Sequence, residues 1–472
     1  MTRRTILTLL AVAIAAGAYI APVKAKATPR RYLVLSKSDS SVPDSVFTQI
    51  QKAGAKIRKN LAPIGLVAVT SDDPTFPSKV PDALAVMPDL RITTGRPKII
   101  EGPDLSSARV PGPPNAVDDD PYLNLQWGIT AVDAQNAWKQ GRRGKKAIIA
   151  VLDEGVDATH PDLAPNVRAD LSTSFAEDCN GNIENWQPDP GFYFNHGTHV
   201  AGIAAAADNG IGIIGVAPQA QIMAVGVLSR CLGYGLDSWI LDGIRYAADH
   251  GADVINMSLG GILNVNGECD SPDNCYTAAD VRMTVRAYAN AAAYARRRGV
   301  TVIASSGNDG VNFDDQPDLI NLPSDAPGIL AISAVAPIGW GLNANTTPFT
   351  PAYYANFGKG HIALAGPGGT DEYYYTNPAA LCTVIGLTRP CYVFDYVFSD
   401  IPGGYSWAAG TSMAAPHASG VAAQYIGAAG GSLSPVAVEL LLRTLANRPT
   451  GKLIDPFYGS GVVDTTLVDA PY

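Results

Sequence analysis

Short runs of consecutive apolar residues alternate along the chain with longer helix-like stretches. The apolar runs are typical of strands buried on both faces of a parallel sheet. They fall at residues 147–152, 222–227, 252–257, 300–305 and 329–335. The helix-like stretches lie between or after them, at residues 198–207, 236–250, 278–298 and 412–429. This repetition predicts an α/β domain of three layers, with helices on both faces of a mainly parallel central sheet.

A smaller α/β unit is predicted ahead of this domain. Residues 31–36 and 65–70 are predicted strands, residues 43–53 a helix, and residues 81–84 the start of a second helix. The unit ends at about residue 95. Residues 96–119 are rich in Pro, Gly, Asp and Ser, a composition typical of an exposed linker in which proteolysis is tolerated.

The first 27 residues have the pattern of a secretory signal peptide. Arg3 and Arg4 precede an apolar run over residues 6–20, and Ala25 and Ala27 follow with the spacing of a cleavage site. The alternative is a membrane anchor, but the run is shorter than the ~20 residues needed to span a bilayer. We therefore expect a secreted protein, extracellular or periplasmic, that has no membrane partner.

The cysteines agree with an oxidising compartment. Their number is even, and six cysteines allow 15 connectivities. Spacing favours two small closed loops, Cys269–Cys275 and Cys382–Cys391, which leaves Cys179 with Cys231. No CxxC pair occurs, so a cysteine-bound zinc is not expected.

Charge separates the two predicted units. Residues 1–115 carry a net charge of +8, whereas the whole chain carries −9, so the remainder carries −17. An acidic domain of this size argues against nucleic-acid binding. Acidic surface can serve solubility alone; the alternative is that the basic N-terminal unit packs against the acidic domain.

Three segments place a reactive side chain at the end of a predicted element. Asp153 follows a buried strand, His196 opens a helix of small residues, and Ser412 begins another helix. A serine hydroxyl needs a base to take its proton, a histidine can be that base, and a carboxylate can orient the histidine. Each residue alone would more often be a turn or capping residue, and only the combination indicates nucleophilic catalysis.

A fourth side chain fits the same chemistry. Asn308 follows the predicted strand 300–305, at the carboxyl edge of the sheet where α/β folds place ligands. Its amide could donate to the oxyanion of a tetrahedral intermediate, with the backbone N–H of Ser412 as the second donor.

These segments resemble the subtilisin family of serine endopeptidases over residues 120–470. The motifs are DEGVDATHPDL, HGTHVAG, SSGNDG and GTSMAAPHASG, and the order Asp, His, Ser is the subtilisin order. The resemblance implies that Asp153 orients, His196 is the general base, Ser412 is the nucleophile and Asn308 the oxyanion donor. It implies polypeptide substrates, no organic cofactor, and a monomer.

The resemblance also assigns the chain's organisation. It implies that residues 28–95 are a ferredoxin-like prosegment, which assists folding and then inhibits the enzyme. The maturation cut is expected in the linker 96–119, and the mature catalytic domain would comprise residues 120–472. Such a chain would be a zymogen that matures by cleaving itself.

A substrate-binding strand is implied by the sequence NMSLGG. In the family, substrate backbone adds to such a strand, which here comprises Ser258, Leu259, Gly260 and Gly261. Asn321 and Leu322 are expected to line the first specificity pocket. No acidic residue is evident there, so neutral or apolar substrate side chains are expected.

A calcium site is a further implication of the family. Asp120, Asp178 and Asn209, the last in the loop 206–213, match the positions of an oxygen-rich structural site. The alternative is a plain surface loop. His196 and His199 are three apart on a predicted helix but lack an HExxH pattern, so a zinc site formed by this pair is not expected. The five histidines other than His196 are expected to be structural.

Two departures from the family pattern stand out. Glu154 follows the presumed triad aspartate, where an extra carboxylate would act on the field around His196. Residues 269–275 and 369–404 are insertions, the second rich in tyrosine, and it forms either a disulfide-closed surface loop or a wall of the cleft. Two alternative functions are a catalytically silent scaffold that keeps the fold and an esterase that uses the same triad. The complete triad argues against the scaffold, and the strand-like substrate segment 258–261 argues against the esterase.

Overall fold

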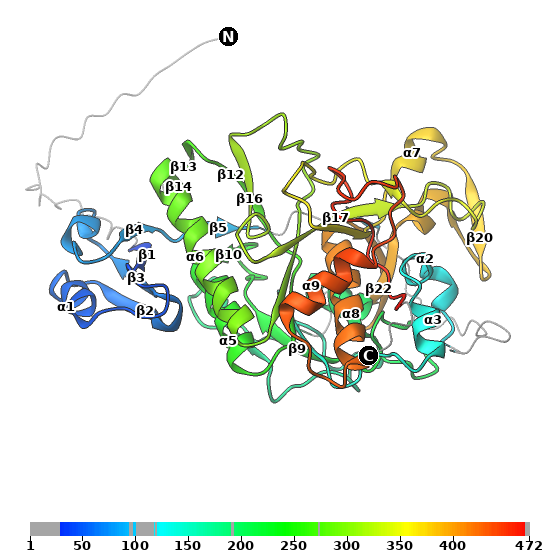
Figure 1. The fold of residues 1–472 in the computed structure, drawn as a ribbon, viewed down its shortest axis with the longest axis horizontal. Helices are drawn as coiled ribbons and strands as arrows, with labels where there is room; N and C mark the ends of the chain where they lie inside the picture. Colours follow the sequence, from blue (N-terminus) through cyan, green and yellow to red (C-terminus); the bar gives the residue numbers. More distant parts are fainter. Residues whose placement is uncertain are drawn as a thin grey trace, which may run out of the picture.

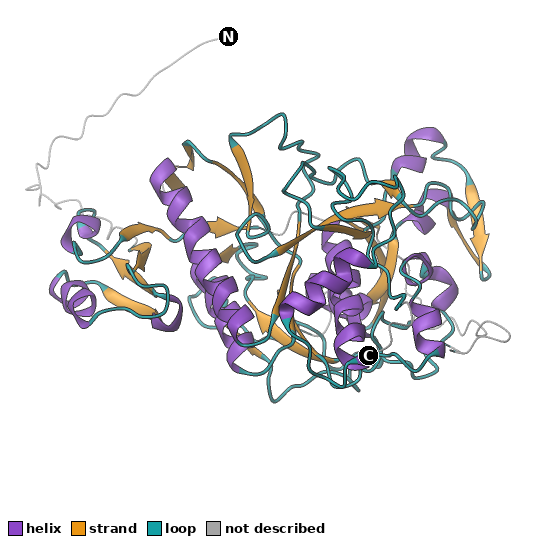
Figure 2. Cartoon of the chain, viewed as in Figure 1, coloured by secondary structure: helices purple, strands orange, loops and turns teal. Residues whose placement is uncertain are grey.

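A computed structural model describes residues 29–93, 98–100, 118, 120–189, 193–271 and 274–467. The predicted signal peptide and most of the predicted linker lie outside these residues. Within the described residues, no helix combines the length and the apolar character needed to cross a membrane. The elements are shown in Figure 1, and their types in Figure 2.

The main domain, residues 120–467, is built on an eight-stranded sheet. Its strands are ordered β18-β17-β15-β11-β7-β9-β8, with β19 also paired to β17, and every pairing except β17–β18 is parallel. Their bounds are β7 (Ile148–Asp153), β8 (Thr173–Ser174), β9 (Gln221–Gly226), β11 (Val254–Met257), β15 (Thr301–Ser305), β17 (Leu330–Ala336), β18 (Thr350–Pro351) and β19 (Leu364–Pro367). The predicted mainly parallel sheet is confirmed.

Helices cover both faces of this sheet because successive strand side chains point to opposite sides. In β7, Ile149 and Val151 join one hydrophobic core, and Ala150 and Leu152 join another. The first core lies under α4 (His196–Ala205) and α8 (Thr411–Ala428), and the second under α5 (Asp237–Asp249) and α6 (Ala278–Arg297). The predicted three-layer arrangement and its four helices are confirmed.

Smaller elements complete the main domain. An antiparallel hairpin, β22 (Val397–Ile401) with β23 (Gly404–Ala409), leads directly into α8. The remaining helices and strands are α2 (Trp127–Ala131), α3 (Ala134–Lys139), α7 (Glu372–Thr376), α9 (Pro435–Thr444), β10 (Gly235–Leu236), β12 (Gly261–Asn264), β13 (Gly267–Ser271), β14 (Asn274–Thr277), β16 (Leu319–Leu322), β20 (Leu381–Val384) and β21 (Leu387–Pro390). All three expected disulfides are present: Cys179–Cys231, Cys269–Cys275 and Cys382–Cys391.

The insertion 369–404 differs between its middle and its last part, and none of its residues, all of which the structure describes, lines the cavity beside Ser412. Its middle part, β20 and β21, is a hairpin on the surface that the Cys382–Cys391 disulfide closes. Its last part is different, because β22 is buried throughout and packs against α4. The insertion is therefore part of the domain's interior as well as a surface loop.

The N-terminal unit, residues 29–93, is a second small sheet. Its antiparallel order is β2-β3-β1-β4, formed by β1 (Arg30–Leu35), β2 (Lys56–Leu61), β3 (Leu66–Ser71) and β4 (Ala85–Pro88), with α1 (Asp44–Lys52) crossing between β1 and β2. This is the strand order of a ferredoxin-like unit. The expected helix at 81–84 is wrong: those residues form a turn into β4, because Val86 and Met87 face opposite cores as strand residues do.

This unit packs on the helical layer formed by α5 and α6 (Figure 1). One face of its sheet is covered by α1, and the other, which includes Leu33, Leu35 and Leu66, is continuous with the core beneath α5 and α6. Without the main domain that second face would be open to water. Burial of apolar surface therefore holds the two parts together.

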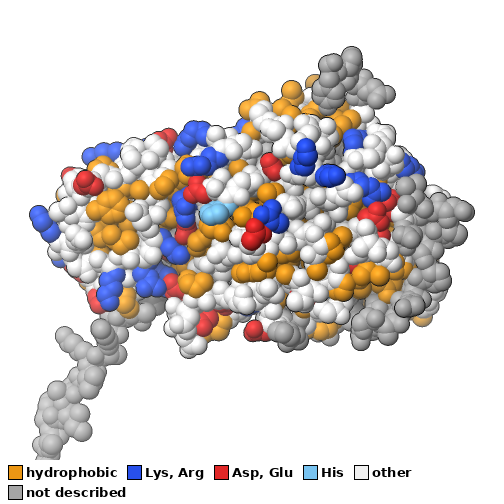
Figure 3. Space-filling model, turned by 90° about the horizontal axis from the view of Figure 1, so that it is seen from below, with side chains coloured by type: hydrophobic (Ala, Val, Ile, Leu, Met, Phe, Trp, Pro, Cys, Tyr) orange, Lys and Arg blue, Asp and Glu red, His pale blue; other side chains and the backbone are white. Residues whose placement is uncertain are grey.

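Opposite charges meet around this apolar contact. Arg31 and Arg58 both form ion pairs with Glu177. Lys59 forms another with Asp242, in which Nζ lies 3.5 Å from Oδ2. Basic side chains are prominent over the N-terminal unit, at the left of Figure 3. The interpretation that the basic unit packs against the acidic domain is therefore the one the structure supports.

Candidate active site

The carboxyl ends of neighbouring parallel strands bring the expected residues to one edge of the sheet. Asp153 is the last residue of β7, Ser258 follows β11, and Asn308 follows β15. Two helices begin at the same edge, with His196 as the first residue of α4 and Ser412 as the second residue of α8. Ligand sites of α/β sheets form at such edges.

A buried pair connects β7 to α4. His196 Nδ1 lies 2.9 Å from Asp153 Oδ1 and 2.8 Å from Oδ2, and both side chains are almost fully buried. This contact fixes the ring so that Nδ1 carries the proton toward the carboxylate and Nε2 is left as the acceptor. His196 Nε2 has no hydrogen-bond partner among the described residues.

The close approach of β7 and α4 requires a glycine after the histidine. A Cβ atom on Gly197 would lie 2.2 Å from the Gly155 carbonyl oxygen and 2.9 Å from Asp153 Cβ. Any other residue would push the start of α4 away from β7. The HGTH motif therefore has a packing reason for its glycine besides the chemistry of its histidine.

Ser412 is held against the segment that follows β11. Its hydroxyl donates to the Ser258 carbonyl at 3.3 Å, and the Ser258 hydroxyl donates to the Ser412 carbonyl at 2.7 Å. In this conformation the Ser412 hydroxyl therefore does not bond to His196. The start of α8 also places the helix dipole's positive end at this serine.

Thr411 orients the Asn308 side chain. Its backbone N–H and its hydroxyl each donate to Asn308 Oδ1 at 2.8 Å. Because these two bonds hold the amide oxygen at Thr411, the amide Nδ2 group of Asn308 points away from Thr411. Sequence reasoning did not identify Thr411, although it lies inside the GTS motif.

A cavity of about 120 Å³ lies beside these residues. Ser412, Asn308 and Thr411 line it together with Gly260 and Gly261 of the expected substrate strand. The expected Asn321 lines it too, but Leu322 is absent from its walls and pairs with Gly261 in the β12–β16 ladder. Asp309 also lines it, although no acidic residue was expected there.

A segment of the same chain already occupies this side of the cleft. Strand β5 (Arg91–Ile92) pairs antiparallel with β10, and the Thr93 carbonyl accepts a hydrogen bond from Gly260 N–H at 3.4 Å. Thr93 also lines the cavity. The Asp89 carboxylate anchors this segment by accepting bonds from the Ser238 backbone and hydroxyl at 2.8 and 2.6 Å.

The chain then pairs with a second element near the serine. Strand β6 (Lys98–Ile100) forms an antiparallel ladder with residues 407–409 of β23, directly before the turn that leads to Ser412. Residues 91–93 and 98–100 therefore pair with two different elements near Ser412, β10 and β23. A substrate that adds as a strand uses this pairing mode.

Electrostatics prepare His196 for proton transfer. Burial alone would lower its pKa, but the Asp153 carboxylate, and to a smaller extent Glu154, stabilise the imidazolium and raise the pKa above its ordinary value. Burial and the neighbouring Asp153 raise the pKa of Glu154 itself. Glu154 therefore acts on His196 through its charge only at a pH above this raised pKa.

The second histidine of the motif is structural, as expected. His199 is buried, its Nε2 lies 3.2 Å from the Ser406 carbonyl oxygen, and burial lowers its pKa to about 3. It therefore stays neutral near pH 7. Its bond connects α4 to the hairpin that precedes Ser412.

The expected calcium ligands are only partly brought together. Asp120 is fully buried, and neither of its carboxylate oxygens has a hydrogen-bond partner among the described residues. Burial and the nearby Asp208 and Asp162 raise its pKa to about 8, whereas the backbone of Asn209 lowers it. Tyr122 N–H bonds to the Gly212 carbonyl, so this segment packs on the expected loop. An oxygen-rich, acidic neighbourhood with unbonded carboxylate oxygens fits a hard cation.

Asp178 does not belong to this neighbourhood. Its carboxylate accepts backbone N–H groups from Asn180 and Asn182, both at 2.8 Å, within its own surface turn. Asp162 is instead the aspartate ahead of the histidine motif that is close enough to Asp120 to raise its pKa. Asp162 lies in the HPDL motif, so the sequence contained the correct aspartate, but the prediction chose Asp178 instead.

We expect the Glu154→Gln substitution to lower the pKa of His196, because a neutral amide no longer stabilises the imidazolium. Titration of the His196 ring by NMR, in the variant and in the unchanged protein, measures this shift. Asp318→Asn, a change at an exposed carboxylate, is the matched control. An unchanged or higher pKa in Glu154→Gln would show that Glu154 does not act on the ring.

Known proteins share both the sequence and the fold. A family model described as the subtilase family matches residues 144–461. Extracellular basic protease of Dichelobacter nodosus is 32% identical over 391 residues, which are 74% of this chain and 55% of that protein. Thermitase of Thermoactinomyces vulgaris is 32% identical over 309 residues, which are 64% of this chain and 83% of that protein.

Solved structures agree. The crystal structure of fervidolysin from Fervidobacterium pennivorans matches with a TM-score of 0.64 and 26% identity, over 93% of this chain and 60% of that one. The epidermin leader peptide processing serine protease of Staphylococcus aureus matches with a TM-score of 0.69 and 19% identity, over 93% and 98% of the two chains, and shows the fold alone. With the matched motifs lying at one sheet edge, the chain belongs to the subtilase family of serine proteases.

Proposed function

We propose that this protein is a secreted serine endopeptidase. The observation that carries the proposal is the buried Asp153–His196 pair at the same sheet edge as Ser412 and Asn308. The chain spans about half the length of the Dichelobacter protein, so its activity is inferred from its own site.

The proposed reaction begins with Ser412. Rotation about its Cα–Cβ bond turns the hydroxyl toward His196 Nε2, which takes the proton as the oxygen attacks the substrate carbonyl. Asp153 stabilises the resulting imidazolium. Asn308 Nδ2 and the Ser412 N–H stabilise the oxyanion; losing such an asparagine costs about 10²–10³ in kcat, a range measured in subtilisin.

The imidazolium then protonates the leaving amine, which departs and leaves an acyl group on Ser412. Water repeats the sequence, with His196 as base, and releases the acid. Only neutral His196 can start either step, so the rate falls as pH drops through its pKa. Because Asp153 and Glu154 raise that pKa, the fall begins at a higher pH than for an isolated histidine.

The proposal includes a zymogen. Residues 29–93 would be the prosegment, and their last strand lies in the cleft as a substrate would. Because residues 91–93 and 98–100 pair with two different elements near Ser412, we propose that the maturation cut falls between Thr93 and Lys98. This range lies at the boundary between the N-terminal unit and the linker 96–119. Residues 1–27 would be a signal peptide.

Intact mass and N-terminal sequence of the secreted protein test this proposal. We expect the wild type to lose the chain up to a bond between Thr93 and Lys98, and Ser412→Ala to keep the N-terminal unit. The wild type should also react with a fluorophosphonate probe, whereas Ser412→Ala should not. Retention of the unit by both proteins, with no probe reaction, would favour a silent scaffold and contradict the proposal.

The cavity suggests a preference in the substrate. The buried Asn321 Oδ1 has no hydrogen-bond partner among the described residues, and the Asp309 carboxylate lies at the same cavity. An unpaired buried acceptor favours a ligand that donates a hydrogen bond. We propose that the residue before the cut bond carries an N–H donor, as lysine and glutamine do, rather than a purely apolar side chain.

We expect a peptide with lysine at this position to lose about two- to five-fold in kcat/KM when Asp309 is changed to Asn, the size of one exposed charge pair. A matched peptide with leucine should be unaffected, which makes it the control. Steady-state rates with both peptides and both proteins measure the effect. A preference for leucine in the wild type would contradict a donor-binding pocket, and a short ester that outcompetes both peptides would favour an esterase.

A structural calcium ion is the second component of the proposal. We propose that Asp120 and Asn209, with Asp208, hold it and tie the start of the main domain to the loop after α4. A bound ion would supply the positive charge that the buried Asp120 carboxylate lacks.

We expect calcium to raise the melting temperature of the full-length Ser412→Ala protein, which cannot digest itself. At about 100-fold excess over Kd the stabilisation is ~2.7 kcal/mol. Adding Asp120→Asn should remove most of this response, and adding Asp178→Asn should leave it intact. Thermal unfolding with and without calcium measures both, and loss of the response in the Asp178→Asn protein instead would contradict this ligand set.

A further inference from the structure

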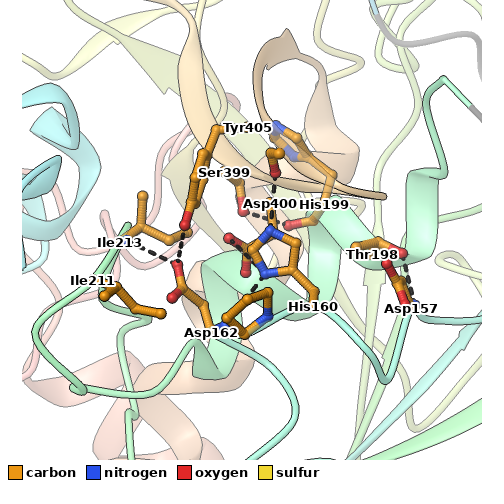
Figure 4. Close-up of polar contacts among 12 residues, drawn as sticks. Asp157, His160, Asp162, Thr198, His199, Ile211, Ile213, Ser399, Asp400 and Tyr405 are labelled. Carbon is orange, nitrogen blue, oxygen red and sulfur yellow. Dashed lines mark hydrogen bonds and ion pairs between the residues drawn. The ribbon is translucent and has the colours of Figure 1, made fainter. Parts of the chain in front are cut away.

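Asp162 also belongs to a second cluster of polar side chains, which is distinct from the expected calcium ligands. His160 and Asp162 are in the loop after β7, and Asp400 comes from β22 of the insertion (Figure 4). Their ligand atoms lie within 4.8 Å of one another, and all three side chains are at most 2% exposed. The cluster is therefore assembled in the interior from segments about 240 residues apart.

The two carboxylates have acceptor atoms that nothing satisfies. Asp162 Oδ2 accepts bonds from the Ile213 N–H and the Tyr405 hydroxyl, both at 3.0 Å, but its Oδ1 has no partner among the described residues. Neither oxygen of Asp400 has one. No Lys or Arg of the described chain pairs with either carboxylate, and uncompensated buried charge is costly.

His160 is oriented as a metal-binding histidine would be. Its Nε2 lies 3.0 Å from the Gly404 carbonyl oxygen, so that nitrogen carries the proton and Nδ1 presents a lone pair. Ligating histidines usually donate their other N–H to a carbonyl or carboxylate in this way. Nδ1 receives one long contact, from the Asp162 N–H at 3.3 Å, and faces Asp400.

The spacing between His160 and Asp400 favours an ion over a shared proton. His160 Nδ1 lies 3.7 Å from Asp400 Oδ1, which is too long for a hydrogen bond. Two ligand atoms that are each about 2.0–2.2 Å from one tetrahedral zinc ion lie roughly 3.3–3.6 Å apart, which is close to this separation. Two groups that both present lone pairs at this separation leave room for a cation between them.

We propose that His160 Nδ1, Asp162 Oδ1 and a carboxylate oxygen of Asp400 bind a divalent transition-metal ion of the zinc class. One imidazole nitrogen and two carboxylates are a borderline donor set that suits zinc, whereas calcium requires six to eight oxygens. Three protein ligands leave a fourth tetrahedral position for water. This site shares Asp162 with the calcium neighbourhood but differs from it, because it combines Asp162 Oδ1 with His160 and with a residue of the insertion.

The ion would hold the hairpin β22–β23 against the main domain. Asp400 already packs on α4, because a Cβ on Gly202 would lie 2.6 Å from its Oδ2. The neighbouring Ser399 hydroxyl donates to the His199 carbonyl at 2.8 Å. The site would thus connect the hairpin that precedes Ser412 to the loop after β7, next to the helix that begins with His196, and we assign it a structural role.

Metal content tests the proposal on the full-length Ser412→Ala protein, with calcium in excess throughout. After exposure to Zn²⁺ and dialysis we expect about one equivalent of zinc, removed by 1,10-phenanthroline with a fall in melting temperature that Zn²⁺ reverses. Asp400→Asn in the same background should lose at least about ten-fold in zinc affinity, and Asp318→Asn should not. Tyr405→Phe, which removes one of the two hydrogen bonds to Asp162 Oδ2, should weaken binding by about 10- to 100-fold.

Cobalt provides a readout that does not depend on the variants folding. Co²⁺ bound to the protein with an unaltered cluster should show the visible bands of a tetrahedral nitrogen–oxygen site, and Zn²⁺ should abolish them. Absence of both zinc retention and cobalt bands would overturn the proposal and leave a protonated Asp400 as the explanation. Equal zinc binding by Asp400→Asn and by the parent protein would overturn it as well.

Discussion

The candidate active site depends on the close contact between the end of β7 and the start of α4. The Asp153–His196 pair forms only because a glycine follows the histidine, so that helix and strand backbones can approach to van der Waals distance. The parallel sheet, buried on both faces, keeps β7 in place, and the small residues of α4 and α8 let these helices pack closely beneath it. The geometry of this pair is therefore a consequence of how tightly this layer packs, and a larger side chain at Gly197 would move His196 away from Asp153.

The N-terminal unit uses two kinds of interaction for two purposes. Its apolar sheet face merges with the core beneath α5 and α6, and that burial supplies the attachment. The ion pairs at Glu177 are half-exposed on the arginine side and contribute less, but they fix how the unit sits. That orientation directs the segment 91–93 along β10 and into the cavity beside Ser412. Attachment outside the cleft thus makes occupation of the cleft an intramolecular event.

Much of the fold could be predicted because its signals are local. Parallel strands buried on both faces read as apolar runs, and the motif residues stand at the ends of those runs. Strand β2 shows no such signal, because it is a mostly exposed edge strand rich in basic residues, with the sequence KIRKNL. Asp178 was mistaken for Asp162 because several aspartates precede the histidine motif, and only the folded chain shows which one meets Asp120. Likewise Asp309 follows Asn308 directly, yet its place at the cavity depends on the turn between them and the sheet.

The insertion 369–404 shows most clearly where local reasoning ends. Its tyrosines and its disulfide indicate a surface loop, and for β20 and β21 that is correct. Nothing in the sequence SDIPGGY indicates that Asp400 enters the interior, because burying a lone carboxylate is unfavourable until its partners are known. Those partners, His160 and Asp162, belong to a motif that the sequence already explains by family resemblance. An insertion that supplies a buried carboxylate to an existing motif therefore changes what that motif can bind, and the hairpin that carries it leads directly to the nucleophile.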